Sequence, residues 1–136
     1  MGERSRLFVY GSLRAGAGHP MHAVLAKAGT FVGRGRVRGH LLRIDWYPGL
    51  VRLDDVDDTV VGDLWSLDDP TALRELDAYE GCGPDAEPPH EFERRSTTVV
   101  LDDGRTLPAW VYVYAGPVPA RLPRIPSGDW LCADRH

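Results

Sequence analysis

The chain is predicted to form an α+β fold built on a mixed, partly closed β-barrel with two or three short helices. Three observations favour this class. Short segments with alternating apolar and polar residues outnumber segments with helical periodicity, glycine, proline and aspartate separate these segments, and no internal repeat is present. A chain of 136 residues fits one domain, which we expect to span residues 1–136.

The N-terminal part is expected to contain a strand, a glycine-rich loop and a short helix. Residues 6–10 have the apolar character of a buried strand, and three glycines follow between Gly11 and Gly18. Pro20 suits a first helical turn and Gly29 suits a helix end. The apolar residues that share one face of this helix are Met21, Val24, Leu25 and Ala28.

The middle of the chain is expected to supply strands of one sheet or barrel. The predicted strands are 31–37, 40–44, 50–53 and 60–67. A second helix then runs to Glu80. Asp68 or Asp69 can cap it, Pro70 fits its first turn, and Gly81 ends it. Its inward-facing residues are Leu73 and Leu76.

The last third is expected to form a loop, a hairpin and a terminal turn. Residues 82–90 contain three prolines and no periodicity, which is typical of a loop that covers a site. Strands at 96–101 and 109–115 flank a turn at Asp102-Asp103-Gly104. Residues 127–131 are predicted to form a short turn that docks Trp130.

Charge and cysteine content narrow the class of protein. A net charge of −4 and a pI near 5.7 argue against non-specific nucleic-acid binding. The arginines at 34, 36, 38 and 43 are spaced like the solvent face of a strand. Two cysteines, Cys82 and Cys132, do not make a disulfide framework. With neither a secretory leader nor an apolar run of membrane-spanning length, we expect a cytoplasmic protein without a membrane partner.

Two segments carry the chemistry. Tyr10-Gly11-Ser12-Leu13 follows a strand and offers consecutive backbone N–H groups, which suit a carboxylate or a developing oxyanion. Leu76-Asp77-Ala78-Tyr79-Glu80-Gly81 delivers a carboxylate at a helix end, where it is unfavourable against the helix dipole. Together the two segments indicate a site that handles an amide.

These two segments resemble motifs of the γ-glutamylcyclotransferase-like family. The resemblance continues through Tyr47-Pro48-Gly49-Leu50, Phe92-Glu93-Arg94 and Gly128-Asp129-Trp130, and it covers about residues 6 to 131. Leu13 places the loop nearer to the γ-glutamylamine cyclotransferase type than to members with asparagine at this position. The resemblance also implies the partly closed barrel.

The resemblance implies a small-molecule γ-glutamyl substrate whose α-amine attacks its own γ-carbonyl and releases 5-oxoproline and a free amine. Glu80 is then the catalytic base and acid, and Tyr10, Gly11, Ser12 and Leu13 form the substrate-binding loop. Neither a metal nor a cofactor is required. Further substrate-binding candidates are Tyr47, Arg94, Tyr112 and Tyr114.

Other interpretations of the same residues remain open. Arg95 is an alternative to Arg94, and the stripe of Tyr112 and Tyr114 with Trp110 is more typical of a core than of a ligand wall. A non-catalytic small-molecule binding module that uses the same pocket is the main rival function. A protein-interaction domain that uses the loop 82–90 is a third, and the sequence does not predict an oligomeric state.

Several other sites are disfavoured by their spacing. Gly11 and Gly16 have the gap of a phosphate-binding loop, but the lysine and hydroxyl residue that should follow are missing. His19 and His22 lack a third metal ligand nearby. Ser12 is not in a nucleophile motif, and the Cys82 thiol has no recognisable histidine partner. The aspartates at 54, 55, 57 and 58 do not follow the calcium-loop pattern.

Overall fold

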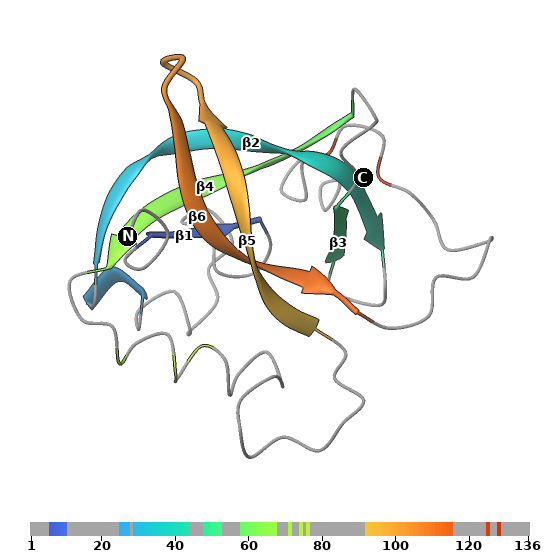
Figure 1. Cartoon of the computed structure of the whole chain (residues 1–136), viewed down its shortest axis with the longest axis horizontal. Coiled ribbons are helices and arrows are strands. Elements are labelled where there is room, and N and C mark those ends of the chain that lie inside the picture. Colours follow the sequence, from blue (N-terminus) through green and yellow to red (C-terminus); the bar gives the residue numbers. More distant parts are fainter. Residues whose placement is uncertain are drawn as a thin grey trace.

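The strands of the protein curl into a barrel (Figure 1). The computed structural model describes residues 6–10, 25–27, 29–43, 48–52, 58–67, 71, 74, 76, 92–115, 125 and 128. The strands in these ranges are β1 (Arg6–Val9), β2 (Gly29–Arg43), β3 (Pro48–Arg52), β4 (Thr59–Leu67), β5 (Phe92–Leu101) and β6 (Thr106–Tyr114).

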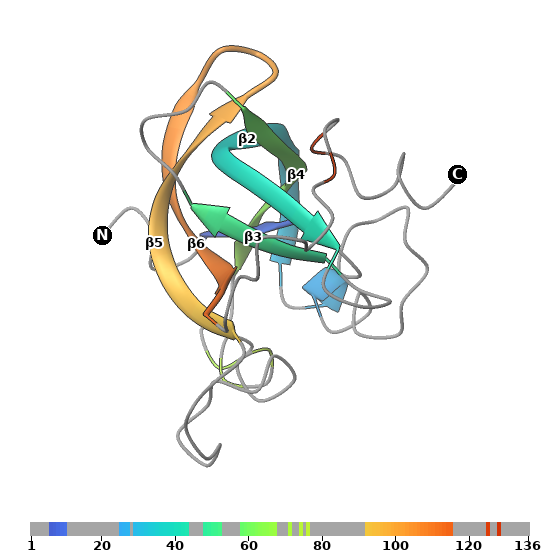
Figure 2. The same cartoon turned by 90° about the vertical axis from the view of Figure 1, so that its right-hand side faces the viewer.

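The barrel closes through a second pairing of β2. The order along the sheet is β3-β2-β4-β1-β6-β5, and β2 also pairs with β5, where Gly35 lies opposite Leu101. Five strands therefore form a closed ring, while β3 extends the sheet beyond β2 (Figure 2). The β1–β6 pairing is parallel and the other pairings are antiparallel. The predicted α+β class with a mixed barrel is confirmed.

The prediction of two strands at 31–37 and 40–44 was wrong, because β2 is continuous. Strand β2 pairs with β4 as far as Arg38, which lies opposite Thr59, and with β3 from Gly39 onward. Gly39 has a φ of 151°, a conformation that residues with a Cβ atom rarely adopt. The glycine lets the strand turn from one partner to the next without a break.

The predicted hairpin is confirmed, and its first strand starts earlier than expected. β5 begins at Phe92, which lies opposite Tyr114 and meets its ring edge-on at 5.8 Å. The charged run Glu93-Arg94-Arg95 has no apolar alternation, so the sequence pattern did not reveal this part of the strand.

The structure supports both predicted helices as far as it describes them. Residues 25–27 are helical and Leu25 is fully buried. Thr71, Arg74 and Leu76 are also helical, and Leu76 is fully buried as predicted. Leu73, the helix ends, the loop 82–90 and Trp130 lie outside the described residues. No helix in the described part of the chain is long and apolar enough to cross a membrane.

Two apolar clusters lie on the two faces of the curled sheet. Adjacent strand residues point to opposite faces, so Phe8 joins one cluster while Leu7 and Val9 join the other. The inner cluster, to which all six strands contribute, comprises Phe8, Tyr10, Val37, Leu41, Leu50, Val60, Leu64, Val99, Leu101, Ala109, Val111 and Ile125. The outer cluster, to which both helical segments contribute, comprises Leu7, Val9, Leu25, Trp65, Leu67, Leu76 and Tyr112.

A C-terminal clasp, formed by Ile125 and Gly128, joins two barrel strands. The Ile125 N–H donates to the Leu41 carbonyl on β2 at 2.7 Å, and the Val61 N–H on β4 donates to the Gly128 carbonyl at 2.7 Å. The Gly128 N–H donates back to the Ile125 carbonyl at 3.0 Å. Gly128 has a φ of +67°, and a Cβ atom there would collide with the Thr59 carbonyl oxygen. The backbone conformation and the close Thr59 carbonyl thus explain why the first residue of the Gly128-Asp129-Trp130 motif is a glycine.

Candidate active site

Four of the predicted site residues lie within the described structure: Tyr10, Arg94, Tyr112 and Tyr114. The predicted catalytic residue Glu80 lies outside it. The other predicted residues outside the described ranges are Gly11, Ser12, Leu13 and Tyr47. The described residues next to these segments in the chain are those of β1 and Tyr10, before Gly11, and Leu76, before Glu80.

Tyr10 directly follows β1 and lies in the inner cluster with 6% of its surface exposed. Its hydroxyl donates to the Tyr112 carbonyl at 2.6 Å and accepts from the Leu50 N–H at 3.1 Å. These contacts tie the end of β1 to β6 and to β3. Leu50 belongs to the predicted Tyr47-Pro48-Gly49-Leu50 segment, so two predicted site segments meet at this hydroxyl.

The outer cluster brings together the elements that carry the loop and the glutamate. Val9 immediately precedes the Tyr10–Leu13 segment, and Leu76 lies four residues before Glu80. Both Val9 and Leu76 belong to one apolar cluster, and the position of Glu80 itself stays a prediction.

Arg94 and Arg95 point to opposite faces of β5 because they are consecutive strand residues. Arg94 lies opposite Tyr112 of the outer cluster, and its guanidinium stacks 4.5 Å from the centre of the Trp110 ring. Arg95 forms an exposed ion pair with Glu93. The structure thus places Arg94, and not Arg95, on the face that carries the outer cluster.

The two tyrosines of the aromatic stripe have different surroundings. Tyr112 is 4% exposed and packs in the outer cluster, which matches the core alternative. Tyr114 is half-buried at the end of β6, against Phe92. Of the two, Tyr114 retains more accessible surface. Contact of either with a substrate stays a prediction.

Asp63 is a residue that the sequence interpretation missed. It is 6% exposed and is the one charged side chain that is buried in the described part of the chain. It lies opposite Val9 on β1 and opposite Arg34 on β2, and strand alternation places it on the outer face with Trp65. An aspartate between Gly62 and Leu64 in a strand that is apolar on both faces was the signal that could have revealed it.

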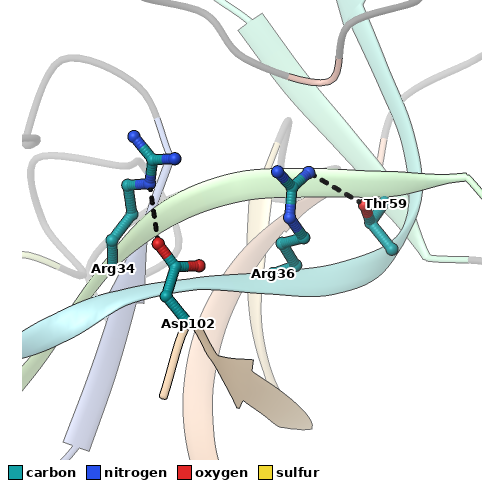
Figure 3. A network of polar contacts seen from close by, with 4 residues as sticks. All are labelled: Arg34, Arg36, Thr59 and Asp102. Atoms are coloured by element: carbon teal, nitrogen blue, oxygen red, sulfur yellow. Dashed lines mark hydrogen bonds and ion pairs between the residues drawn. The ribbon is translucent and has the colours of Figure 1, made fainter. Parts of the chain in front are cut away.

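The prediction that the β2 arginines face solvent is confirmed for three of the four. Arg34, Arg36 and Arg38 are exposed, whereas Arg43 is half-buried. Arg34 Nε lies 3.2 Å from Asp102 Oδ2, and Arg36 Nη1 donates to Thr59 Oγ1 at 3.4 Å (Figure 3). These contacts hold β2 against the hairpin turn and the start of β4.

The hairpin turn holds a further charged pair. The Arg105 backbone N–H donates to Asp103 Oδ1 at 3.0 Å, and its guanidinium lies 2.8 Å from Oδ2. These hydrogen bonds lower the pKa of the Asp103 carboxyl. The turn follows the 10-residue strand β5, so it lies up to about 30 Å along the strand from Phe92. The pair is remote from the candidate site.

Within the described ranges no three His, Cys, Asp or Glu side chains gather as metal ligands.

Comparisons with known proteins agree with the motifs. Residues 7–132 match the family described as "Gamma-glutamyl cyclotransferase, AIG2-like". The gamma-glutamylcyclotransferase family protein YtfP of Escherichia coli K12 is 34% identical over 131 residues, which cover 96% of this chain and 99% of YtfP.

Solved structures share the fold. A mouse AIG2-like protein has a TM-score of 0.71 at 27% identity, with 93% of this chain and 89% of the mouse chain covered. Bacillus subtilis YkqA has a TM-score of 0.71 at 23% identity, and this chain spans 44% of its length. Because the family match extends over nearly the whole chain and is joined by the likeness to YtfP, the protein belongs to the gamma-glutamyl cyclotransferase, AIG2-like family.

Proposed function

We propose that the protein is a cyclotransferase that cleaves a γ-glutamyl amide by intramolecular attack and releases 5-oxoproline and a free amine. Membership of the family supports the reaction class. The observation that supports the proposal for this chain is the outer cluster, because it contains both Val9, which precedes the predicted substrate loop, and Leu76, which lies on the predicted helix to Glu80. The proposal includes a single domain that acts in the cytoplasm on a small molecule.

The proposed mechanism uses one carboxylate for two proton transfers. Glu80 takes a proton from the α-ammonium group, and the free amine attacks the γ-carbonyl carbon to close a five-membered ring. The carbonyl π electrons move to oxygen, and backbone N–H groups of the Tyr10–Leu13 loop stabilise the oxyanion. Glu80 then protonates the leaving nitrogen as the carbonyl re-forms and the C–N bond breaks, and the second proton that the ring nitrogen gives up passes to the released amine. Water is not consumed, and the internal nucleophile leaves no step that needs a cofactor.

The remaining predicted residues would hold the substrate in its folded conformation. Arg94 is the proposed partner of the substrate α-carboxylate, since a guanidinium can bind a carboxylate through two parallel hydrogen bonds. Its stacking on Trp110 would orient the guanidinium plane. Tyr47, Tyr112 and Tyr114 are proposed to line the same region.

The reaction is tested by mass-spectrometric detection of 5-oxoproline. The substrates are γ-glutamyl dipeptides, γ-glutamyl amines and γ-glutamyl-ε-lysine. We expect product from the wild type, and a loss of at least ~100-fold in Glu80→Gln, because the amide cannot act as a general acid or base. Asp102→Asn is the matched control, since it makes the same chemical change on an exposed carboxylate in the hairpin turn.

Three outcomes would contradict parts of the proposal. Cleavage of an N-acetylated γ-glutamyl substrate at a comparable rate would show a hydrolase, because its nitrogen cannot close the ring. Tight calorimetric binding of the unmodified substrates without product would favour the binding module. Full activity in Glu80→Gln would remove Glu80 from the mechanism.

A further inference from the structure

We propose that the Tyr10 hydroxyl is a positioning group, which holds the end of β1, β3 and β6 at fixed spacing around the candidate site. The substrate is then contacted by the backbone around Tyr10 and not by the phenol. This inference rests on the proposed cyclotransferase function and assigns a distinct role to one of its residues.

The hydroxyl already forms hydrogen bonds with two protein groups. Its proton is donated to the Tyr112 carbonyl at 2.6 Å, and an oxygen lone pair accepts the Leu50 N–H at 3.1 Å. A phenol has a single proton to donate. Tyr10 therefore cannot donate to a substrate oxyanion without giving up its bond to Tyr112, and its burial at 6% exposure opposes such a change.

The two partners lie on strands that the backbone of Tyr10 does not pair with. The parallel β1–β6 pairing ends with Phe8 opposite Val111, so Tyr112 is the next residue along β6. Leu50 lies opposite Leu41 in the β2–β3 pairing, yet its N–H is directed to the phenol. The side chain of Tyr10 thus links β6, just past its pairing with β1, to β3, with which β1 does not pair.

The same hydroxyl joins three segments that are predicted to surround the substrate: the loop that starts at Tyr10, the Pro48–Leu50 part of β3, and Tyr112. Intramolecular attack depends on the relative placement of the groups that fold the substrate, and a displacement of about 1 Å can cost ~100-fold in rate. A buried bridge between these segments would maintain that placement.

The test variant is Tyr10→Phe, which removes the hydroxyl and keeps the ring. We expect kcat for 5-oxoproline formation to fall at least ~10-fold, while KM changes less than ~3-fold, because the substrate still binds but is misaligned. By hydrogen-exchange NMR, the Leu50 amide should exchange at least ~10-fold faster, and the Leu64 amide of the inner cluster should keep its rate. The control is Thr98→Val, which removes a hydroxyl from an exposed position on β5 and should change neither quantity.

The outcomes distinguish a role of the Tyr10 hydroxyl in positioning the substrate-binding segments from a role in stability alone. An unchanged kcat in a folded Tyr10→Phe protein, or an unchanged Leu50 exchange rate, would overturn the inference. A lower thermal midpoint with full kcat would equally overturn it, by showing structural support alone.

A measurement on the wild type covers the case in which the variant does not fold. The Tyr10 hydroxyl proton should give a slowly exchanging resonance with a nuclear Overhauser effect to the Leu50 amide proton, and absence of this signal would overturn the bridge. If the wild type forms no 5-oxoproline, the proposed function fails. The hydroxyl and amide measurements need no substrate, so they still show whether the Tyr10 hydroxyl links Leu50 to Tyr112.

Discussion

At the residue scale, two polar side chains flank the end of β1 on opposite faces of the sheet. Tyr10 lies in the inner cluster, and Asp63 lies opposite Val9 on the outer face. Each is buried, and a buried polar group is stable only when it has partners. Tyr10 therefore places a polar group inside the apolar barrel, and Asp63 places one on its outer face.

We expect Asp63→Ala to lower the free energy of unfolding by about 1–3 kcal/mol, because the group that interacts with the buried Asp63 side chain loses its partner. Asp102→Ala removes a carboxylate that is half-exposed and should cost less than about 0.5 kcal/mol. Urea unfolding at neutral pH measures both. Equal effects of the two substitutions would show that burial of Asp63 does not distinguish it from a surface aspartate.

At the element scale, the C-terminal clasp substitutes for a strand. The N–H of Ile125 and the carbonyl of Gly128 are bonded to β2 and β4, respectively, although neither residue is in a strand. The clasp lies beside the point where β2 leaves β4 for β3, as the Gly39 N–H bond to the Asp58 carbonyl at 3.0 Å marks. It holds the two strands together where their direct pairing ends.

Gly128→Ala should release this clasp. The substitution combines a left-handed backbone with a collision at the Thr59 carbonyl, so we expect a loss of more than about 1 kcal/mol and faster exchange of the Val61 amide. Gly104→Ala is the matched control, because Gly104 has a φ of 95° but open space around its Cβ position. Calorimetry and hydrogen exchange should rank Gly128→Ala as the more damaging. A larger effect at Gly104 would refute the role of the close contact.

At the scale of the whole molecule, the two clusters have separate tasks. The inner cluster fills the closed barrel, and the outer cluster attaches the helical segments to it. Leu76 belongs to the outer cluster and lies four residues before Glu80 in the sequence, so the predicted helix to Glu80 would depend on the packing of this cluster. The barrel can therefore be stable while the site is disturbed.

The elements that were predicted correctly are those with a local sequence pattern. Strands and hairpin were recognisable because alternation and turn residues are local, and burial of Leu76 followed from helical spacing. The continuity of β2 was missed because a glycine such as Gly39 usually indicates the end of a strand. Here Gly39 lies within the strand, at the point where β2 changes its pairing partner. The double contact of the Tyr10 hydroxyl could not be predicted, since its partners lie 40 and 102 residues away.

A pair of leucine substitutions tests whether the clusters are separable. Leu76 and Leu64 are both fully buried, in the outer and inner cluster respectively, so Leu76→Ala and Leu64→Ala should each cost about 2–5 kcal/mol in unfolding free energy. At a temperature where both variants stay folded, Leu76→Ala should lose at least ~10-fold more kcat for 5-oxoproline formation, because the helix that leads to Glu80 loses its anchor. Circular dichroism fixes that temperature, and steady-state kinetics compares the two variants. Equal losses of kcat would show that the site responds to the stability of the whole barrel and not to the outer cluster in particular.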